Sequence, residues 1–159
     1  MSAVDFASRL TKVGIMPLNL IKLCVGCDSV EDLREWVGWR LGEMRKARKK
    51  PEHIHVTRMT PKRADELLDG GSLYWVIKGI IQVRQRLLAI RPFTDNEGIH
   101  RCGLVLEPKL VLTDWQPKSA FQGWRYFPEK DAPNDLRPGR GGDDLPPALR
   151  AELAELGLR

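Results

Sequence analysis

Hydrophobic residues recur at spacings of three and four after Ser29, and this pattern predicts the first helix of the chain. Residues at these spacings share one face of an α-helix, and here they are Val30, Leu33, Val37, Leu41 and Met44. The run Ser29-Val-Glu-Asp32 has the form of a capping box, in which the serine oxygen accepts a backbone N–H of the first turn. Because Pro51 cannot continue a helix, we expect this helix to end just before it.

Alternating and β-branched runs predict strands over much of the remaining chain. Residues 53–59 alternate between polar and apolar with a period of two, which is typical of a half-buried strand. Further strands are expected over residues 17–25, 73–77, 80–90, 102–106, 110–113 and 123–127, with a bend or bulge at Gly79. Thr60 and Pro61 suit the cap and first residue of a short second helix over residues 62–68, closed by Gly70 and Gly71.

The order of these elements predicts one α+β domain. A strand, a helix, a strand and a helix precede a run of strands, so we expect a curved, mainly antiparallel sheet or partial β-barrel with two flanking helices. A chain of 159 residues suits one hydrophobic core. We place the domain at residues 16–128. Residues 1–15 would be a flexible arm or an upstream start, and the Pro- and Gly-rich residues 129–159 a mobile tail.

Composition places the chain among globular proteins, with 42% hydrophobic and 30% charged residues. No apolar stretch approaches the length of a membrane span, and residues 1–14 lack the apolar run of a secretory signal. Three cysteines, an odd number, argue against a disulfide framework. We therefore expect a cytoplasmic protein with reduced thiols and no membrane partner.

Lys and Arg are concentrated between residues 34 and 63. This stretch contains ten basic and three acidic residues, which gives it a local charge of +7, compared with +5 for the whole chain. A surface that follows phosphates needs such clustering, because several counterions must be released together. The cationic end of the first helix holds Arg45, Lys46, Arg48, Lys49 and Lys50. The alternative interpretation is a solvated helix end that keeps the protein soluble.

Aromatic and cationic residues accumulate in the β-rich half of the chain: Tyr74, Trp75, Arg84, Arg86, Arg91, Trp115, Trp124, Arg125 and Tyr126. Proteins that bind single-stranded RNA stack bases on aromatic rings while Arg and Lys hold phosphates. Packing is the other use of such rings, and we expect it for Trp75 in the core and for Trp124 at one end of the barrel. We place an RNA-binding cleft at Tyr74, Arg84, Arg86, Trp115 and Arg125.

Cys24 and Cys27 have the spacing of half a zinc site. The possible completing ligands are Cys102, His100, His53 and His55, but a second pair with the usual spacing is missing. A redox-active pair of this spacing opens a helix, whereas Asp28 and Ser29 intervene here. Metal binding and redox activity stay open as alternatives, and we expect packed thiols, with no metal and no cofactor.

Two hypotheses from other functional classes remain beside RNA binding. His53 or His55 could form an acid–base pair with Asp28, Glu107 or Asp114, which would suit a small enzyme acting on a nucleotide or modified base. The sequence has no glycine-rich phosphate loop, nucleophile elbow or zinc-protease helix, so we lean away from catalysis. The third hypothesis is a protein-interaction module that recruits a partner through residues 129–159.

Four runs, residues 17–33, 55–61, 74–79 and 121–126, resemble a family of short bacterial proteins, chiefly alphaproteobacterial, known only as a domain of unknown function. This resemblance covers about residues 16–128 and implies no activity. Residues 74–78 are also similar to an opening strand in the EVE branch of the pseudouridine-synthase-and-archaeosine-transglycosylase (PUA)-like superfamily, and residues 78–84 to an ASCH segment. Lys78 preceding the glycine and Gln82 in place of glutamate depart from that segment.

The PUA-like resemblance implies a small curved β-barrel with helices that binds RNA or modified bases in a cleft. Together with the charge distribution, it leads us to expect a nucleic-acid-binding module, with RNA favoured over DNA. The cationic helix end and the aromatic, basic cleft would form the binding surface.

Overall fold

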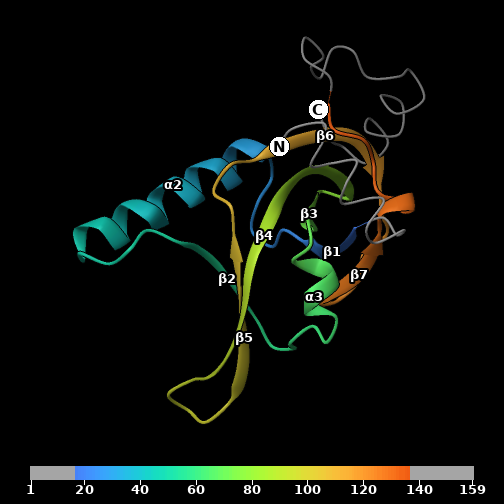
Figure 1. Ribbon diagram of the computed structural model, residues 1–159. Helices are drawn as coiled ribbons and strands as arrows, with labels where there is room; N and C mark the ends of the chain where they lie inside the picture. The colour runs from blue at the N-terminus through green and yellow to red at the C-terminus, as the bar shows by residue number, and fades with distance from the viewer. Residues whose placement is uncertain (1–16, 137–159) are drawn as a thin grey trace, which may run out of the picture.

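A bent seven-stranded sheet carries the fold of residues 17–136, the part of the chain that the computed structural model describes (Figure 1). In chain order the elements are β1 (Leu18–Leu23), α2 (Val30–Lys46), β2 (His53–Thr57), α3 (Ala64–Leu67), β3 (Ser72–Ile77), β4 (Ile80–Thr94), β5 (His100–Leu106), β6 (Val111–Pro117), β7 (Trp124–Pro128) and the 3-10 helix η1 (Glu129–Asp131). The predicted α+β class with a curved, mainly antiparallel sheet and two helices is thereby confirmed.

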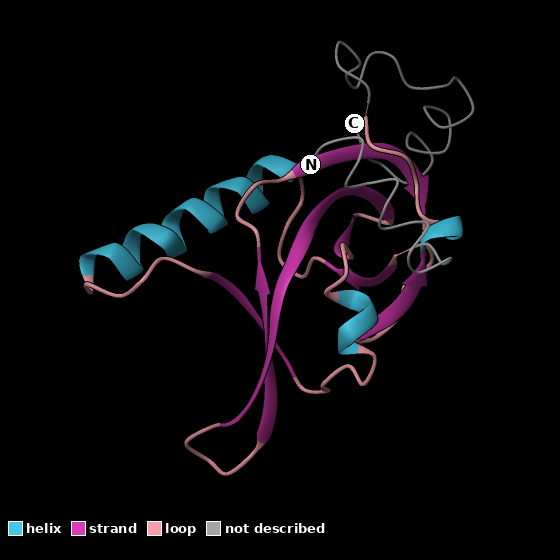
Figure 2. Cartoon of the chain, in the orientation of Figure 1, coloured by secondary structure: helices cyan, strands magenta, loops and turns pink. Residues whose placement is uncertain are grey.

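Strand β4 organises the sheet, whose strand order is β2-β5-β4-β3-β1-β7 with β6 also paired to β4. The first part of β4 pairs with β3 and β6, and its last part pairs with β5. Shifts in register interrupt these ladders between Ile81 and Val83 and between Leu87 and Ala89. Such irregularities bend and twist a strand, and Figure 2 shows β4 curving through the centre of the molecule. The β1–β3 pair is parallel, whereas the other pairs between named strands are antiparallel.

The bend predicted at Gly79 is a tight hairpin turn. Lys78 and Gly79 both have positive φ, 52° and 77°, which matches a two-residue type I′ connection between β3 and β4. Lys78 also forms an ion pair of 2.9 Å with Asp28, in the turn before α2. The register shifts of the sheet lie within the strands rather than at the glycine.

Helix α2 follows its predicted pattern closely. The Ser29 hydroxyl accepts the Asp32 N–H at 3.2 Å, and Leu33, Val37 and Leu41 are buried on one face. This face packs into the main core with residues from β1, β3, β4 and β5. Burial of that stripe therefore fixes α2 across the sheet.

The second helix is shorter than predicted and does not begin at Thr60. It covers Ala64–Leu67, because residues 59–63 are held to β7 instead. The Tyr126 hydroxyl accepts the backbone N–H groups of Lys62 and Arg63, and the Trp124 indole N–H donates to the Met59 carbonyl at 2.8 Å.

The chain continues to contact the sheet beyond Pro128. Asn19 donates to the Glu129 carboxylate at 2.7 Å, and Asp135 forms an isolated bridge with Thr113 of β6. The expected arm over residues 1–15 and the part of the expected tail over residues 137–159 lie outside the described residues. Neither helix within residues 17–136 has the length and apolar character needed to span a membrane.

Gly71 joins α3 to β3 at a close approach of three backbone segments. A Cβ atom at this position would overlap the carbonyl oxygens of Leu18 and Leu67, whereas a Cβ at Gly42 in α2 would meet open space. We therefore expect Gly71→Ala to lower the free energy of unfolding by about 3 kcal/mol or more, because backbone atoms must move apart. Gly42→Ala should instead raise it by about 1 kcal/mol, since alanine favours the helix.

Urea denaturation of the two variants and the unaltered chain tests this prediction. Equal stabilities for Gly71→Ala and Gly42→Ala would show that the close approach at Gly71 is absent.

Candidate functional site

The C-terminal end of α2 projects from the body of the molecule and carries the predicted cationic cluster (Figure 1). All five of its members are exposed, namely Arg45, Lys46, Arg48, Lys49 and Lys50. Lys46 forms a long ion pair of 3.5 Å with Glu43, and none of the other four pairs with a carboxylate within residues 17–136. We call these five residues the cationic end. Its positive charge is largely uncompensated by the described part of the chain.

Arg48 occupies a backbone position that favours glycine. Helix α2 ends in a Schellman motif, in which Lys49 N–H donates to the Met44 carbonyl at 2.8 Å and Arg48 N–H donates to the Arg45 carbonyl at 3.0 Å. This motif requires the left-handed conformation at Arg48, where φ is 58°. This conformation costs a residue with a Cβ atom about 1 kcal/mol or more of folding free energy. An arginine here therefore lowers the stability of the fold while it adds a positive charge.

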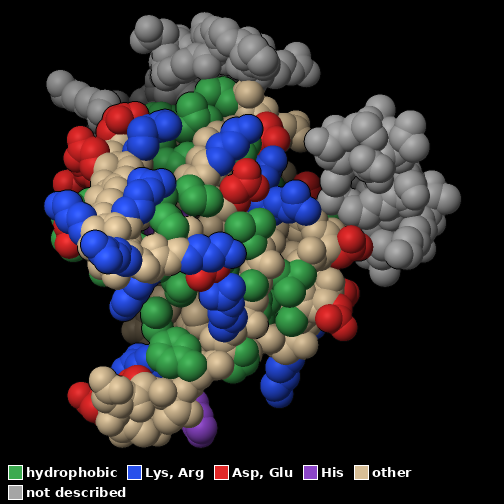
Figure 3. Space-filling view, turned by 60° about the vertical axis from the view of Figure 1, so that its left-hand side comes forward, with side chains coloured by type: hydrophobic (Ala, Val, Ile, Leu, Met, Phe, Trp, Pro, Cys, Tyr) green, Lys and Arg blue, Asp and Glu red, His purple; other side chains and the backbone are tan. Residues whose placement is uncertain are grey.

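Two tryptophans that are at least partly exposed lie closer to the beginning of α2. Trp36 and Trp39 are 38% and 62% exposed, and the Arg40 guanidinium lies 4.8 Å from the centre of the Trp36 ring. Figure 3 shows hydrophobic side chains interleaved with Lys and Arg on the face seen there. An aromatic ring next to a guanidinium suits stacking with a base.

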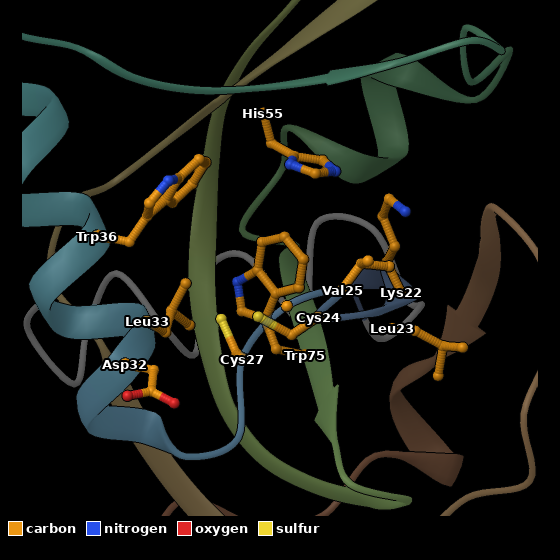
Figure 4. A pocket seen from close by; sticks show the side chains of 11 residues that line it. Lys22, Leu23, Cys24, Val25, Cys27, Asp32, Leu33, Trp36, His55 and Trp75 are labelled. Atoms are coloured by element: carbon orange, nitrogen blue, oxygen red, sulfur yellow. The ribbon is translucent and has the colours of Figure 1, made fainter.

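A cavity of about 320 Å³ opens beside the first turns of α2 (Figure 4). Strands β1, β2 and β3, the turn after β1 and helix α2 form its walls. The lining residues are Lys22, Leu23, Cys24, Val25, Gly26, Cys27, Asp32, Leu33, Trp36, His55 and Trp75. We call it the α2 pocket. Sequence reasoning did not assemble it, because its residues come from four separate elements.

Trp75 and His55 form the inner wall of the α2 pocket. Their rings meet edge to face, with centroids 5.0 Å apart. The Trp75 indole N–H donates to Gln85 Oε1 at 2.9 Å, away from solvent, so the only polar atom of this side chain is satisfied. Trp75 is 2% exposed, as expected for a core residue, and its ring also borders the pocket.

His53 and His55 carry buried nitrogen atoms without partners. Both ring nitrogens of His53 and Nε2 of His55 are buried and have no hydrogen bond within the described residues. Burial, and then the positive charges of Arg40 for His53 and of Lys22 for His55, lower the pKa of each imidazole from 6.5 to about 4. Both rings are therefore neutral at pH 7, and each carries one N–H donor and one acceptor nitrogen.

Two thiols, one amine and one carboxylate also line the pocket. Burial, followed by a hydrogen bond with Cys27, raises the pKa of the Cys24 thiol well above its usual range, so Cys24 stays protonated. Burial lowers the pKa of Lys22. The Asp32 carboxylate accepts the Asp28 N–H at 2.9 Å, and no hydrogen bond joins it to His55 within residues 17–136.

No group of three or more His, Cys, Asp or Glu in the described part of the chain has the arrangement of a metal site.

The turn after β1 explains the Cys24–Cys27 spacing. Gly26 has φ of 86° and Cys27 N–H approaches the Cys24 carbonyl at 3.4 Å, so the chain reverses direction and brings the thiols to one wall of the pocket.

Three residues of the predicted cleft meet in a second cavity of about 400 Å³, on the side of the sheet near η1. Tyr74, Arg84 and Arg86 all line it. Tyr74 is 2% exposed and its ring packs edge to face on Phe127, so its faces are not open to a base. Arg84 donates two hydrogen bonds of 2.8 Å to the Asp135 carboxylate, which neutralises its charge. Arg86 is exposed.

The other two members of the predicted cleft lie elsewhere. Trp115 is half-buried on β6, and Arg125 is exposed on β7 with its guanidinium 4.9 Å from the centre of the Phe121 ring. Neither residue lines the second cavity or the α2 pocket. The five residues proposed from sequence therefore do not form one cleft.

The strongest sequence signal for the α2 pocket is the pair His53 and His55 on one face of a predicted strand. Period-two spacing placed both rings on the same side of β2, and the structure buries that side against Trp36 and Trp75. Lys22 had no such signal, because it lies in an otherwise apolar strand.

Comparison with known proteins gives one match. A family model with the description "Protein of unknown function (DUF1489)" matches residues 20–159. No curated protein and no solved structure matches the chain.

The buried imidazoles predict a loss of stability in acid. Because their folded pKa of about 4 lies below the unfolded value of 6.5, the unfolded chain binds more protons between these values. The stabilisation is complete above pH 6.5 and declines as the pH falls towards 4. Replacing His53 with Leu should make the difference in unfolding free energy between pH 7 and pH 4 smaller by about 2 kcal/mol.

His100 is exposed and supplies the matched control. Urea denaturation as a function of pH should show an unaltered slope for His100→Asn. If His53→Leu and His100→Asn have the same pH dependence, the burial of a neutral His53 is refuted.

Proposed function

We propose that this chain, which belongs to the DUF1489 family of proteins of unknown function, is an RNA-binding module that uses the cationic end of α2. The observation that carries the proposal is the cationic end itself, with five exposed Lys and Arg among residues 45–50. Release of counterions from phosphates rewards such a cluster, and five contacts to a single strand correspond to a salt slope of about −3.5.

The backbone conformation of Arg48 supports a role for its charge. Glycine would satisfy the Schellman motif without strain, yet arginine occupies the left-handed position, where φ is 58°. A residue that costs stability is common at functional sites. Solubility alone gives no reason to keep a cation at this particular position.

Aromatic residues on the same helix favour RNA over duplex DNA. Trp36 and Trp39 are exposed on α2, and Arg40 lies over the Trp36 ring. Single-stranded RNA offers unstacked bases that can stack on such rings, whereas duplex DNA keeps its bases stacked on one another. We also propose that the protein is cytoplasmic and that its domain is related to the PUA-like superfamily.

The other two hypotheses receive less support. Cys24 is protonated and no hydrogen bond joins Asp32 to His55 within residues 17–136, so these three residues supply neither a thiolate nor an acid–base pair. Recruitment of a protein through residues 129–159 depends mainly on residues 137–159, which lie outside the described chain.

Charge reversal at the cationic end tests the proposal. We expect Arg48→Glu with Lys49→Glu to weaken binding of a labelled single-stranded RNA of about 12 nucleotides at least about tenfold, because two phosphate contacts become repulsive. Between about 50 and 200 mM salt, the slope of log affinity against log salt should become shallower by about 1.4. Fluorescence anisotropy measures both quantities.

The matched control reverses two exposed lysines that are not part of the cationic end, Lys109 and Lys130. This variant has the same net charge as the first one. Equal losses of affinity for the two variants would mean that net charge, rather than the cationic end, attracts RNA.

Arg48→Gly should separate stability from binding. We expect the free energy of unfolding to rise by about 1 kcal/mol, because glycine relieves the left-handed strain. The salt slope of RNA binding should become shallower by about 0.7, as one phosphate contact is lost. Ala47→Gly at the neighbouring cap, where φ is −81°, is the control and should give neither the gain in stability nor the change in slope. A variant Arg48→Gly that binds RNA with an unaltered slope would contradict a phosphate contact at Arg48.

A further inference from the structure

The α2 pocket has the size and shape of a site for one small ligand. Its volume of about 320 Å³ lies at the lower end of the range of about 300 to 1,000 Å³ that is usual for ligand pockets. Figure 4 shows the side chains of Trp36, His55, Trp75 and Lys22 directed towards the same space. Two indole rings and one imidazole thus border a volume sufficient for a single flat ring system.

The polar atoms of this wall point to the chemistry of the ligand. Nε2 of His55 is buried and has no partner within residues 17–136, although buried polar atoms are nearly always hydrogen-bonded. Lys22 is half-buried, forms no ion pair within the described chain, and brings only donors. A ligand with an acceptor on the edge of a flat ring would satisfy Lys22, beside the buried His55 ring.

We propose that the α2 pocket binds one nucleobase with a carbonyl acceptor, such as guanine, against Trp36, with its polar edge towards Lys22 and with Trp75 and His55 behind it at the inner wall. Lysine pairs readily with the O6 and N7 acceptors of guanine, and flat aromatic walls accept the base by stacking. The base comes either from a free nucleotide or from an unstacked position of an RNA strand. In its RNA form, the inference rests on the proposed function.

The position of the pocket relative to the cationic end suits the RNA form. Trp36 and Arg45 are nine residues apart on one helix, which corresponds to about 14 Å along its axis. Arg40 lies between them and over the Trp36 ring. A strand within the range of about 4 to 16 nucleotides covered by single-strand-binding domains reaches both places.

Two tryptophans on the same helix provide a matched pair of variants. Trp36 lines the α2 pocket, whereas Trp39, three residues further along and more exposed, does not. Calorimetric titration of the full chain with GMP should show binding that Trp36→Ala and Lys22→Met each weaken about tenfold, whereas Trp39→Ala leaves it unchanged. Ribose 5-phosphate, which lacks the base, should not compete. Far-ultraviolet circular dichroism establishes that each variant is folded.

The RNA arm uses a guanine-containing single strand with the Trp36 and Lys22 variants, and it separates the two proposals. If Lys22→Met weakens RNA binding as Trp36→Ala does, the pocket receives a base of the strand, whether or not free GMP binds, because Lys22 lines the pocket and does not belong to the cationic end. If Trp36→Ala and Lys22→Met alter neither GMP nor RNA binding, or if ribose 5-phosphate competes as well as GMP, the pocket proposal is overturned. In that case the proposed function is tested only by the RNA affinity and salt slope of the cationic-end variants. Binding of GMP that depends on Trp36, without any RNA binding, would overturn the proposed function and support the pocket.

Discussion

The curvature of strand β4 is the constraint on which the rest of the structure depends. Its first part lies between β3 and β6, its last part pairs with β5, and the register shifts within it turn the sheet around the core. In the strand order, β4 and β5 separate β3 from β2, so a flat sheet would hold β3 and β2 about 14 Å apart. The ring centroids of Trp75 on β3 and His55 on β2 are nevertheless 5.0 Å apart. The α2 pocket is therefore a product of the bend, and α2 closes the open side of it by burying its apolar stripe.

Features that lower stability are concentrated on the side of the molecule where α2 meets β2. Elsewhere, deeply buried polar side chains are satisfied: Asn19 bonds Ser72 N–H and Glu129, and Gln85 bonds Trp75 and the Glu107 carbonyl. Within residues 17–136, the buried side-chain nitrogen and oxygen atoms without partners belong to the two histidines of β2. The strained Arg48 lies just before the same strand. Sequences usually agree with their fold at every level except where function requires otherwise, and the two histidines and Arg48 are exceptions of this kind near α2 and β2. The other described non-glycine residue with positive φ, Lys78, lies in the β3–β4 turn.

Local patterns in the sequence predicted the elements of this fold, but not the site. The capping serine and the apolar spacing located α2 because both signals act within one helix, and the exposed cationic end followed from the charge near Pro51. The α3 start was wrong because Tyr126 and Trp124, more than sixty residues away, hold the preceding loop by hydrogen bonds that no local pattern reveals. The cleft of Tyr74, Arg84, Arg86, Trp115 and Arg125 was inferred from the accumulation of aromatic and basic residues in the β-rich half, which cannot show that Asp135 neutralises Arg84 or that Phe127 packs on Tyr74. Tertiary partners of this kind decide whether a basic or aromatic residue is free to bind anything.

The cationic end and the α2 pocket would contribute to binding in physically different ways. Charges at the exposed end of α2 act over about a Debye length, so their attraction for phosphates depends on salt and hardly at all on sequence. The pocket offers flat apolar walls, a neutral imidazole and an amine that burial partly shields from salt, so its contribution depends on the base and only weakly on ionic strength. An RNA strand would then be attracted first by the exposed charges and selected afterwards by the pocket. If both proposals hold, the two roles account for a helix that carries cations at its C-terminal end and a tryptophan at the pocket, with Arg40 between them.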